Sequence, residues 1–312
     1  MASCPFAIDY IEDSATNRTA HMNHLPFLPF LALLGACAAT ANHDLAFVTT
    51  RDGNYEIYVR NGTDGSMRNL TQHEKLDRQP AWSPDRTHIA FTSSRTGNNE
   101  VFIMAADGSS LRNLTEHPGN DSQPAWSPDG QRLAFVSDRD QDSRELYLIS
   151  VDGSGVQRLT HNTVYEESPE WSPDGKSLVF ARMVGGGKGQ GDGEIFVRDL
   201  AAATDRLVVQ RDGFDGAPSW SPDGRRIAFH GGIGETFDIF LVDADGSNLV
   251  NITHDSIECY QPGWTPDGAR IVFCAGTGPN AYDIWIATAD GSARRQLTHH
   301  PARDEAPTIR PR

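Results

Sequence analysis

The five-residue stretch Trp126-Ser127-Pro128-Asp129-Gly130 decides the fold, because close copies of it recur along the chain. The copies begin at Trp82, Trp126, Trp171, Trp220 and Trp264, and their spacings are 44, 45, 49 and 44 residues. A period of this length is typical of a unit of four short strands, the blade of a β-propeller. A single blade cannot bury its own faces, so we expect the function to belong to a ring of blades and its loops.

The residues around each copy indicate four strands per repeat. The first strand carries the tryptophan, and the Pro-Asp-Gly sequence that follows favours a tight turn. The second strand holds a phenylalanine, the third an acid, and the fourth usually ends in Leu-Thr or Ile-Thr. Six phenylalanines and six acids recur in this way, which predicts six blades: Phe47, Phe91, Phe135, Phe180, Phe229 and Phe273, with Glu56, Glu100, Glu145, Glu194, Asp238 and Asp283.

Only five complete tryptophan motifs accompany the six repeats, and the two ends of the pattern explain the difference. The pattern begins with Leu45-Ala46-Phe47, which is a second strand, and ends with residues 306–311, which align with Pro-Ala-Trp-Ser-Pro. We therefore predict that the last strand becomes the inner strand of the first blade and closes the ring non-covalently. The expected fold is an all-β, six-bladed β-propeller over residues 42–312.

The composition limits the class of protein. Hydrophobic residues make up 38% of the chain, enough for a core, and the formal net charge is −15. This charge argues against nucleic acid, whose binding proteins carry a basic footprint. It is compatible with a cationic partner, a metal ion or plain solubility. We expect a monomer without a transmembrane span.

Residues 1–41 are interpreted as an N-terminal extension with a signal peptide. Leu25–Ala36 is an apolar run too short to span a bilayer, and Ala39-Thr40-Ala41 resembles a cleavage site. Cys37 follows Leu-Gly-Ala, which resembles a lipobox, so a lipid anchor competes with simple cleavage and with a disordered tail. The start, Met1 or Met22, stays open. These features predict a periplasmic or exported protein.

The repeat resembles that of the TolB-type propeller, also called the WD40-like or PD40 repeat. The resemblance rests on Trp-Ser-Pro-Asp-Gly, an Ile/Leu-x-Phe strand, Glu-Ile-Tyr, Asp-Gly and Leu-Thr, and it covers about residues 45–312. In that family the repeat occurs in a periplasmic component of the Tol–Pal system, which binds a peptidoglycan-associated lipoprotein. It also occurs in propellers of serine peptidases and in relatives of oligogalacturonate lyase. The α/β domain that precedes the propeller in TolB has no counterpart in the roughly 44 residues ahead of the first blade.

An acid stands three residues before the motif proline in five repeats, and Cys259, beside Glu258, holds this place in the sixth. Each residue begins an inner strand, so we expect a ring at the channel mouth that binds a hard cation such as Ca²⁺ or a basic side chain. The alternative is a set of separate turn caps bonded to backbone amides. The candidate binding residues are Asp77, Asp121, Glu166, Asp215, Glu258 and Asp304.

A second candidate site is the alternating triplet Asp138, Asp140 and Asp142 in a loop of the third blade. Alternate carboxylates suit Ca²⁺, but the glycine and the final glutamate of an EF-hand are absent. A solvated polar loop is the competing interpretation.

The sequence offers little catalytic chemistry. It contains neither a Gly-x-Ser-x-Gly elbow nor a His-Glu-x-x-His motif. We therefore expect a non-catalytic module that binds an envelope protein or a peptidoglycan-associated lipoprotein. We expect the loops from second to third strand and the blade-to-blade loops, which vary in length and composition, to share one face of the ring and to form its binding surface. The alternative is a carbohydrate-active enzyme resembling oligogalacturonate lyase, to which glutamines just before the motif prolines and arginines of these loops would contribute: Gln79, Gln123, Gln261, Arg51, Arg95 and Arg139. Cys259 and Cys274 are expected either to pair in an oxidising compartment or to stay as free thiols.

Overall fold

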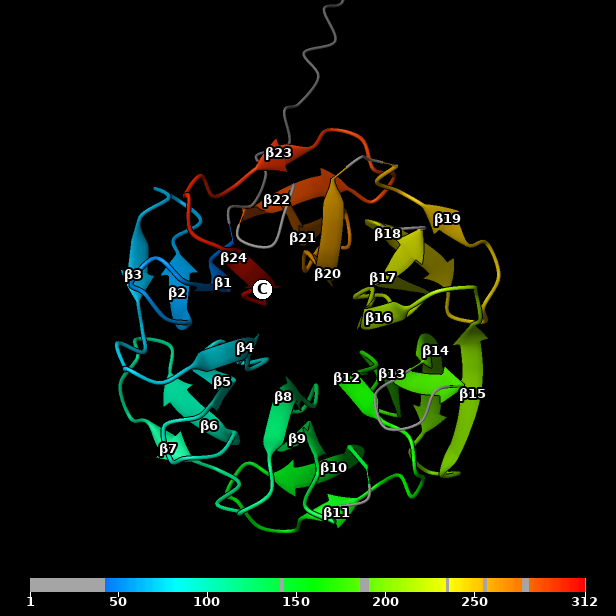
Figure 1. Cartoon of the computed structure of the whole chain (residues 1–312), viewed down its shortest axis with the longest axis horizontal. Helices are drawn as coiled ribbons and strands as arrows, with labels where there is room; N and C mark the ends of the chain where they lie inside the picture. Colours follow the sequence, from blue (N-terminus) through cyan, green and yellow to red (C-terminus); the bar gives the residue numbers. More distant parts are fainter. Residues whose placement is uncertain are drawn as a thin grey trace, which may run out of the picture. The chain divides into compact units, whose positions relative to one another are not determined.

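The computed structural model describes residues 43–140, 143–185, 191–233, 236–254, 257–276 and 281–311. The strands in these residues form six four-stranded antiparallel sheets, which follow one another around a central channel (Figure 1). The predicted all-β, six-bladed propeller is confirmed. The predicted signal peptide and the lipobox cysteine Cys37 lie outside the described residues.

Each blade runs from an inner strand beside the channel to an outer strand at the rim (Figure 1). Blade 1 contains β24 (Asp304–Ile309), β1 (Leu45–Thr49), β2 (Glu56–Arg60) and β3 (Met67–Asn69). Blade 2 contains β4 (Asp77–Trp82), β5 (His88–Ser93), β6 (Glu100–Ala105) and β7 (Arg112–Asn113). Blade 3 contains β8 (Asp121–Trp126), β9 (Arg132–Ser137), β10 (Glu145–Ser150) and β11 (Gln157–Arg158).

The second half of the ring repeats this order with longer hairpins. Blade 4 contains β12 (Glu166–Trp171), β13 (Ser177–Gly185), β14 (Gly191–Asp199) and β15 (Thr204–Val209). Blade 5 contains β16 (Asp215–Trp220), β17 (Arg226–Ile233), β18 (Thr236–Asp243) and β19 (Val250–Asn251). Blade 6 contains β20 (Glu258–Trp264), β21 (Arg270–Gly276), β22 (Tyr282–Thr288) and β23 (Arg295–Gln296).

The ring closes through blade 1, as the sequence predicts. β24 pairs antiparallel with β1, so that Leu45 lies opposite Ile309 and Thr49 opposite Asp304. β2 pairs with the other edge of β1. The C-terminal strand therefore occupies the inner position that β4, β8, β12, β16 and β20 hold in the other blades.

Every inner strand contains a bulge just before its proline. The register of each inner strand shifts there against the second strand of its blade. The residue before the proline takes a positive φ between 44° and 56°: Gln79, Gln123, Ser168, Ala217, Gln261 and Ala306. A bulge bends a strand and re-aims its side chains, so these six residues and their prolines line the channel.

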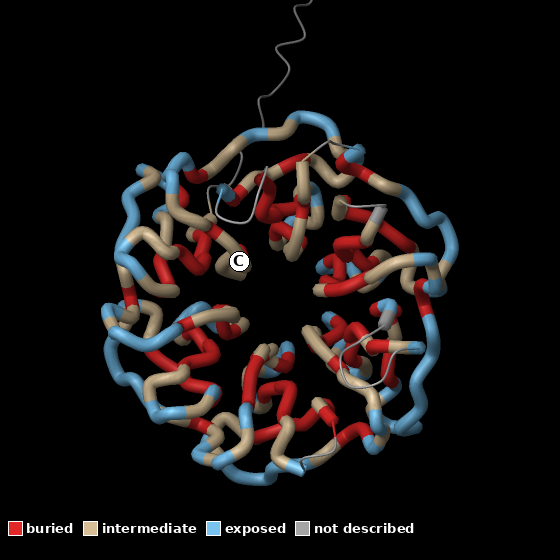
Figure 2. Tube along the Cα trace, in the orientation of Figure 1, coloured by how far each residue is buried: buried red, intermediate tan, exposed pale blue. Residues whose placement is uncertain are grey.

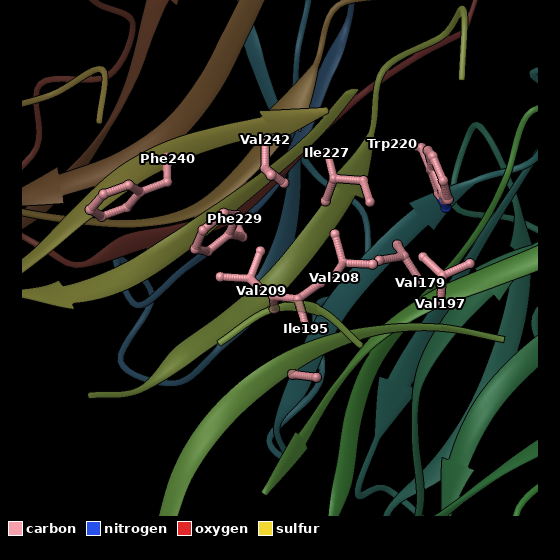
Figure 3. Close-up of a cluster of buried hydrophobic side chains, with 11 residues drawn as sticks. Val179, Ile195, Val197, Val208, Val209, Trp220, Ile227, Phe229, Phe240 and Val242 are labelled. Carbon is pink, nitrogen blue, oxygen red and sulfur yellow. The ribbon is translucent and has the colours of Figure 1, made fainter. Parts of the chain in front are cut away.

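The hydrophobic core lies between neighbouring blades. The six repeated phenylalanines of the second strands are almost completely buried, at 0–1% exposure. In Figure 3, Val179 and Ile195 of blade 4 face Ile227 and Phe229 of blade 5, and Trp220 closes one end of this cluster. The indole of Trp126 donates a hydrogen bond of 3.1 Å to the carbonyl oxygen of Ala81 in the preceding blade. The repeated aromatic residues therefore join blades, and Figure 2 shows the buried residues between the channel and the exposed rim.

The two faces of the ring carry different connections. The turn face carries the Ser-Pro-Asp-Gly turns and the later Asp-Gly turns, as at 127–130 and 107–110. The loop face carries the connections from second to third strand, as at 50–55 and 94–99, and the blade-to-blade connections, as at 70–76, 114–120, 159–165 and 210–214. Backbone hydrogen bonds join these two kinds of connection, for example from Ser94 N to Leu76 O at 3.0 Å and from Asp138 N to Asn120 O at 3.1 Å. The expectation that they share one face is thus met.

Candidate functional site

The loop face carries all six predicted channel-mouth residues, each at or near the start of an inner strand. The side chains of five of them are fully buried, with an exposed fraction of 0%: Asp77, Asp121, Glu166, Asp215 and Asp304. Glu258, in blade 6, is half-buried. The acids therefore lie beneath the surface of the loop face.

Each of the five buried acids forms an ion pair with an arginine of its own blade or of the connection that leads to it. The pairs are Asp304–Arg51 at 3.1 Å, Asp77–Arg95 at 2.9 Å, Asp121–Arg139 at 2.9 Å, Glu166–Arg182 at 2.5 Å and Asp215–Arg211 at 2.5 Å. The arginine side chains are 11–19% exposed, so the guanidinium is the outer partner in every pair. The donors are mainly side chains, rather than the backbone amides of a turn cap.

Each arginine also lies over the aromatic pair of its blade. The Arg95 guanidinium carbon lies 5.6 Å from the ring centroid of Phe91 and 5.1 Å from that of Phe102. Arg95 also donates to Ser93 Oγ at 2.8 Å. An arginine also lies over two rings in blades 1, 3, 4 and 5. We call this unit of acid, arginine and two rings the acid–arginine module.

Burial dominates the electrostatics of two of these acids. It raises the pKa of Glu166, although Arg182 and the hydroxyl of Thr160 oppose the shift. It likewise raises the pKa of Asp215 against the opposing effect of Arg211. A buried carboxylate whose charge is already compensated by a guanidinium group gains little free energy by binding a second cation. Direct binding of a partner by these carboxylates stays a prediction. The arginine side chains are more exposed than the carboxylates, so a partner would contact the arginines first.

Sequence reasoning did not foresee these arginine partners. In blades 1 to 3 the signal is an arginine two residues after the second strand, at Arg51, Arg95 and Arg139. In blades 4 and 5 the arginine comes from other positions: Arg182 lies within β13, and Arg211 precedes β16. The guanidinium occupies the same place in each of these blades, but the arginine does not occupy the same place in each repeat. The pairing therefore cannot be recognised from the repeat alone.

Blade 6 departs from the module. Cys259 replaces the buried acid with an exposed fraction of 0%, and Cys274 in the adjacent strand is 2% exposed. Neither cysteine forms a disulfide, and burial raises the pKa of Cys274. Glu258 accepts a hydrogen bond from the hydroxyl of Tyr282. Of the two alternatives for these cysteines, the structure shows the reduced form.

The acidic triplet of blade 3 is partly outside the described residues, because Asp142 is not among them. Asp138 accepts hydrogen bonds from the backbone and side-chain nitrogens of Asn120, at 2.6 and 2.9 Å. Asp140 accepts from the hydroxyl of Tyr147 and from Arg158 at 2.8 Å. The described part of the chain contains no group of three or more His, Cys, Asp or Glu side chains placed to hold a metal ion. The proposed Ca²⁺ site stays a prediction.

The channel contains two cavities, of about 180 and 350 Å³, lined by the inner strands. The glutamines of the smaller cavity link neighbouring blades: Gln123 Oε1 accepts from Ser168 N, and Gln261 Oε1 accepts from Ala306 N, both at 2.8 Å. The carbonyl oxygens proposed as lyase ligands are therefore already hydrogen-bonded.

Glu170 is the acid that lines both cavities. The corresponding residues of the other inner strands are small: Ala81, Ala125, Ser219, Gly263 and Thr308. The Glu170 carboxylate crosses to blade 5 and accepts a hydrogen bond from Trp220 N at 2.9 Å. Burial raises its pKa to about 7.

The repeats match the family model described as the TolB beta propeller domain, PD40, over residues 39–110, 94–190 and 187–312. The chain belongs to this family. The resemblance inferred from the motifs is therefore confirmed. A comparison with curated protein sequences finds no significant match.

Solved structures share the fold of this PD40 propeller. TolB from Acinetobacter baumannii is 22% identical with a TM-score of 0.74, covering 86% of this chain and 67% of its own. The putative TolB from Agrobacterium tumefaciens is 22% identical with a TM-score of 0.67, covering 82% and 88%. An oligogalacturonate lyase in complex with manganese is 19% identical with a TM-score of 0.55, covering 81% and 72%. At these identities the similarity establishes the fold alone. Among the described residues, no helix has the length and apolar character to cross a membrane.

Proposed function

We propose that this PD40 propeller is a non-catalytic binding module of the cell envelope and that it binds a protein partner through the loop face. The observation that carries the proposal is the contrast between the two faces. Five acid–arginine modules hold a rigid inner margin on the loop face, and connections of different length and composition surround it. Variable loops on a rigid frame are the usual place for binding.

The chemistry of the described residues supports binding rather than catalysis. The five carboxylates of the loop face are paired with arginines, and Glu170 stands alone in the channel. A hydrolase or metal-dependent lyase needs a nucleophile with its base, or several convergent metal ligands. A rigid face with outward guanidinium groups is instead suited to polar and charged groups of another protein.

The proposed partner is a peptidoglycan-associated lipoprotein or another envelope protein, and the proposed location is the periplasm or beyond. The family membership and the TolB structures support this choice of partner class. The signal-peptide interpretation of residues 1–41 supports the location. Anchoring through Cys37 remains an alternative to release into the periplasm.

Direct binding tests the proposal with two matched surface leucines. Leu76 on the loop face is 37% exposed, and Leu111 on the turn face is 43% exposed. Purified residues 42–312 should bind the purified peptidoglycan-associated lipoprotein of the same cell in an interferometry assay. Leu76→Glu should weaken binding about tenfold, because it places a charge in the interface. Leu111→Glu should leave the affinity unchanged. Equal effects of the two variants would contradict the choice of face.

A turnover assay tests the alternative of a carbohydrate-active lyase. We expect no unsaturated product, measured by ultraviolet absorbance, from pectic oligomers with manganese added. Product formation that Gln123→Ala abolishes would overturn the non-catalytic proposal.

A further inference from the structure

The loop face carries an aromatic cluster at the junction of blades 5 and 6 that the acid–arginine modules do not include. It consists of Phe214 before β16, His230 in β17, Phe237 in β18 and Tyr260 in β20, and it continues to Tyr282 in β22. Neighbouring ring centroids lie 4.9–6.2 Å apart. His230 is buried, whereas Phe214, Phe237 and Tyr260 are only half-buried.

The local sequence explains why Phe214 can lie on this surface. Its ring stacks on His230, with centroids 5.7 Å apart and an interplanar angle of 21°. A Cβ atom at Gly216 would lie 2.5 Å from Phe214 Cε1, so only glycine leaves room for the ring. Blades 2 and 3 carry Arg78 and Ser122 at the corresponding position. The cluster is therefore specific to this junction.

A carboxylate lies beside the rings. Glu258 accepts a hydrogen bond from the Tyr282 hydroxyl, and it stands two residues from Tyr260 on β20. Burial and the nearby Glu258 charge raise the pKa of Tyr260 to about 12, so both tyrosine hydroxyls keep their protons at neutral pH. Burial lowers the pKa of His230 to about 3, so this ring is neutral.

Within the described residues, Phe214, Phe237 and Tyr260 lack the cation that lies over the aromatic pair of each acid–arginine module. In blades 1 to 5 an arginine lies over two rings and pairs with an acid, as Arg211 does over Phe240 at 4.0 Å in blade 5. Among the described residues, no arginine or lysine lies over Phe214, Phe237 or Tyr260, and Glu258 forms no ion pair. The guanidinium of Arg303 lies over Tyr282, at 5.0 Å, and pairs with Glu305. Aromatic faces beside a carboxylate attract a guanidinium or an ammonium group.

We propose that the surface formed by Phe214, Phe237, Tyr260 and Glu258 binds an arginine side chain of the protein partner, which completes in trans the arrangement that the chain's own arginines make in blades 1 to 5. The proposal rests on the proposed use of the loop face for binding. The formal net charge of −15 favours a cationic partner group.

A peptide titration tests the proposal without the natural partner. The probe is the blocked tripeptide Gly-Arg-Gly, and its control carries citrulline, which keeps the shape of arginine but lacks the charge. In NMR spectra of ring-labelled protein, the arginine peptide should shift the signals of Phe237 and Tyr260, and the citrulline peptide should bind about tenfold more weakly. Equal shifts with both peptides would overturn the proposal. Tighter binding of choline than of the arginine peptide would also overturn it, in favour of a small-molecule site.

Two variants locate the site. Glu258→Gln should weaken binding of the arginine peptide several-fold at low salt while the protein keeps its fold. Phe237→Leu should weaken this binding about tenfold. The matched control is Tyr165→Leu, because Arg144 already lies 5.9 Å from the Tyr165 ring on the same face. This variant should bind the peptide normally, and loss of binding in it would refute the location.

The lipoprotein assay separates this inference from the proposed function. If Phe237→Leu binds the lipoprotein as tightly as the unchanged protein, the arginine site is wrong and the loop-face proposal stands. If the arginine peptide binds and the lipoprotein does not, the choice of envelope partner is wrong and the site stands.

Discussion

Removing one arginine from an acid–arginine module should destabilise the propeller more than removing the charges of both partners. Asp121 and Arg139 are the best pair for this test. The Asp121 side chain is 0% exposed, and its Oδ2 accepts one hydrogen bond from Arg139 at 2.9 Å. Its Oδ1 is buried and, within the described residues, has no hydrogen-bond partner. Arg139 is thus the main compensation for this carboxylate.

The magnitude follows from burial of the orphaned charge. Arg139→Gln leaves a buried carboxylate without its cation, which typically costs about 3–5 kcal/mol. The same change removes the guanidinium from the rings of Phe135 and Tyr147, at 5.2 and 5.0 Å, a contribution of about 1 kcal/mol. The double variant Asp121→Asn/Arg139→Gln keeps a neutral polar pair in the same space, so we expect it to recover roughly 2 kcal/mol relative to the single variant.

Urea denaturation followed by tryptophan fluorescence measures these free energies of unfolding. The control is Arg68→Gln, which changes an exposed arginine and should alter the free energy by less than about 0.5 kcal/mol. If the double variant is as unstable as the sum of Asp121→Asn and Arg139→Gln, the two side chains do not interact. The description of the module as a structural pair would then be wrong.

Three further predictions concern the channel, the closure and the core. The folded pKa of Glu170, about 7, lies above its ordinary 4.5, so the folded state binds more protons and stability falls as pH rises from about 4.5 to 7. Glu170→Gln should remove this slope and raise the free energy of unfolding at pH 8 by about 1–2 kcal/mol, with no change at pH 4.5. The effect is kept this small because solvent in the channel screens the charge. If the urea midpoints of the variant and of the unchanged protein depend on pH in the same way, the prediction is wrong. Deleting residues 304–312 exposes the inner edge of β1 and should abolish cooperative unfolding, whereas a melting temperature within a few degrees of the full chain would show that the closure contributes little. Phe180→Ala, at 0% exposure, should cost about 3–5 kcal/mol, and a loss below about 1 kcal/mol in calorimetry would show that its site is not tightly packed.

The fold was predictable because local chemistry repeats. The turn after Trp126 depends on Ser127, Pro128 and Asp129, which act over a few residues, and the Ser127 hydroxyl indeed bonds Asp129 at 2.6 Å. The closing strand was predictable because residues 306–311 keep the proline pattern of an inner strand. Such signals are local and periodic, so they can be read without knowing which residues meet in space.

The site was less predictable because its contacts join different parts of the chain. The start of each inner strand was correctly placed on the loop face, but the sequence does not show that Asp304 meets Arg51 across 253 residues. The junction of Phe214, Phe237 and Tyr260 also escaped notice, since each ring comes from a different connection or strand. The acids were expected to be free to bind a cation, but the fold buries five of them and pairs these five with arginines. The types and spacing of the residues do not show this burial.

The pairing of β1 with β24 has a consequence for the order of folding. The two strands come from opposite ends of the repeat array, so blade 1 has no inner strand until β24 has been synthesised and has paired with β1. Until then the edge of β1 is open to other chains, and joining ends so distant in sequence adds an entropic barrier. A circular permutant with its new ends between two other blades would let blade 1 assemble early, and it should refold faster while keeping the same ring.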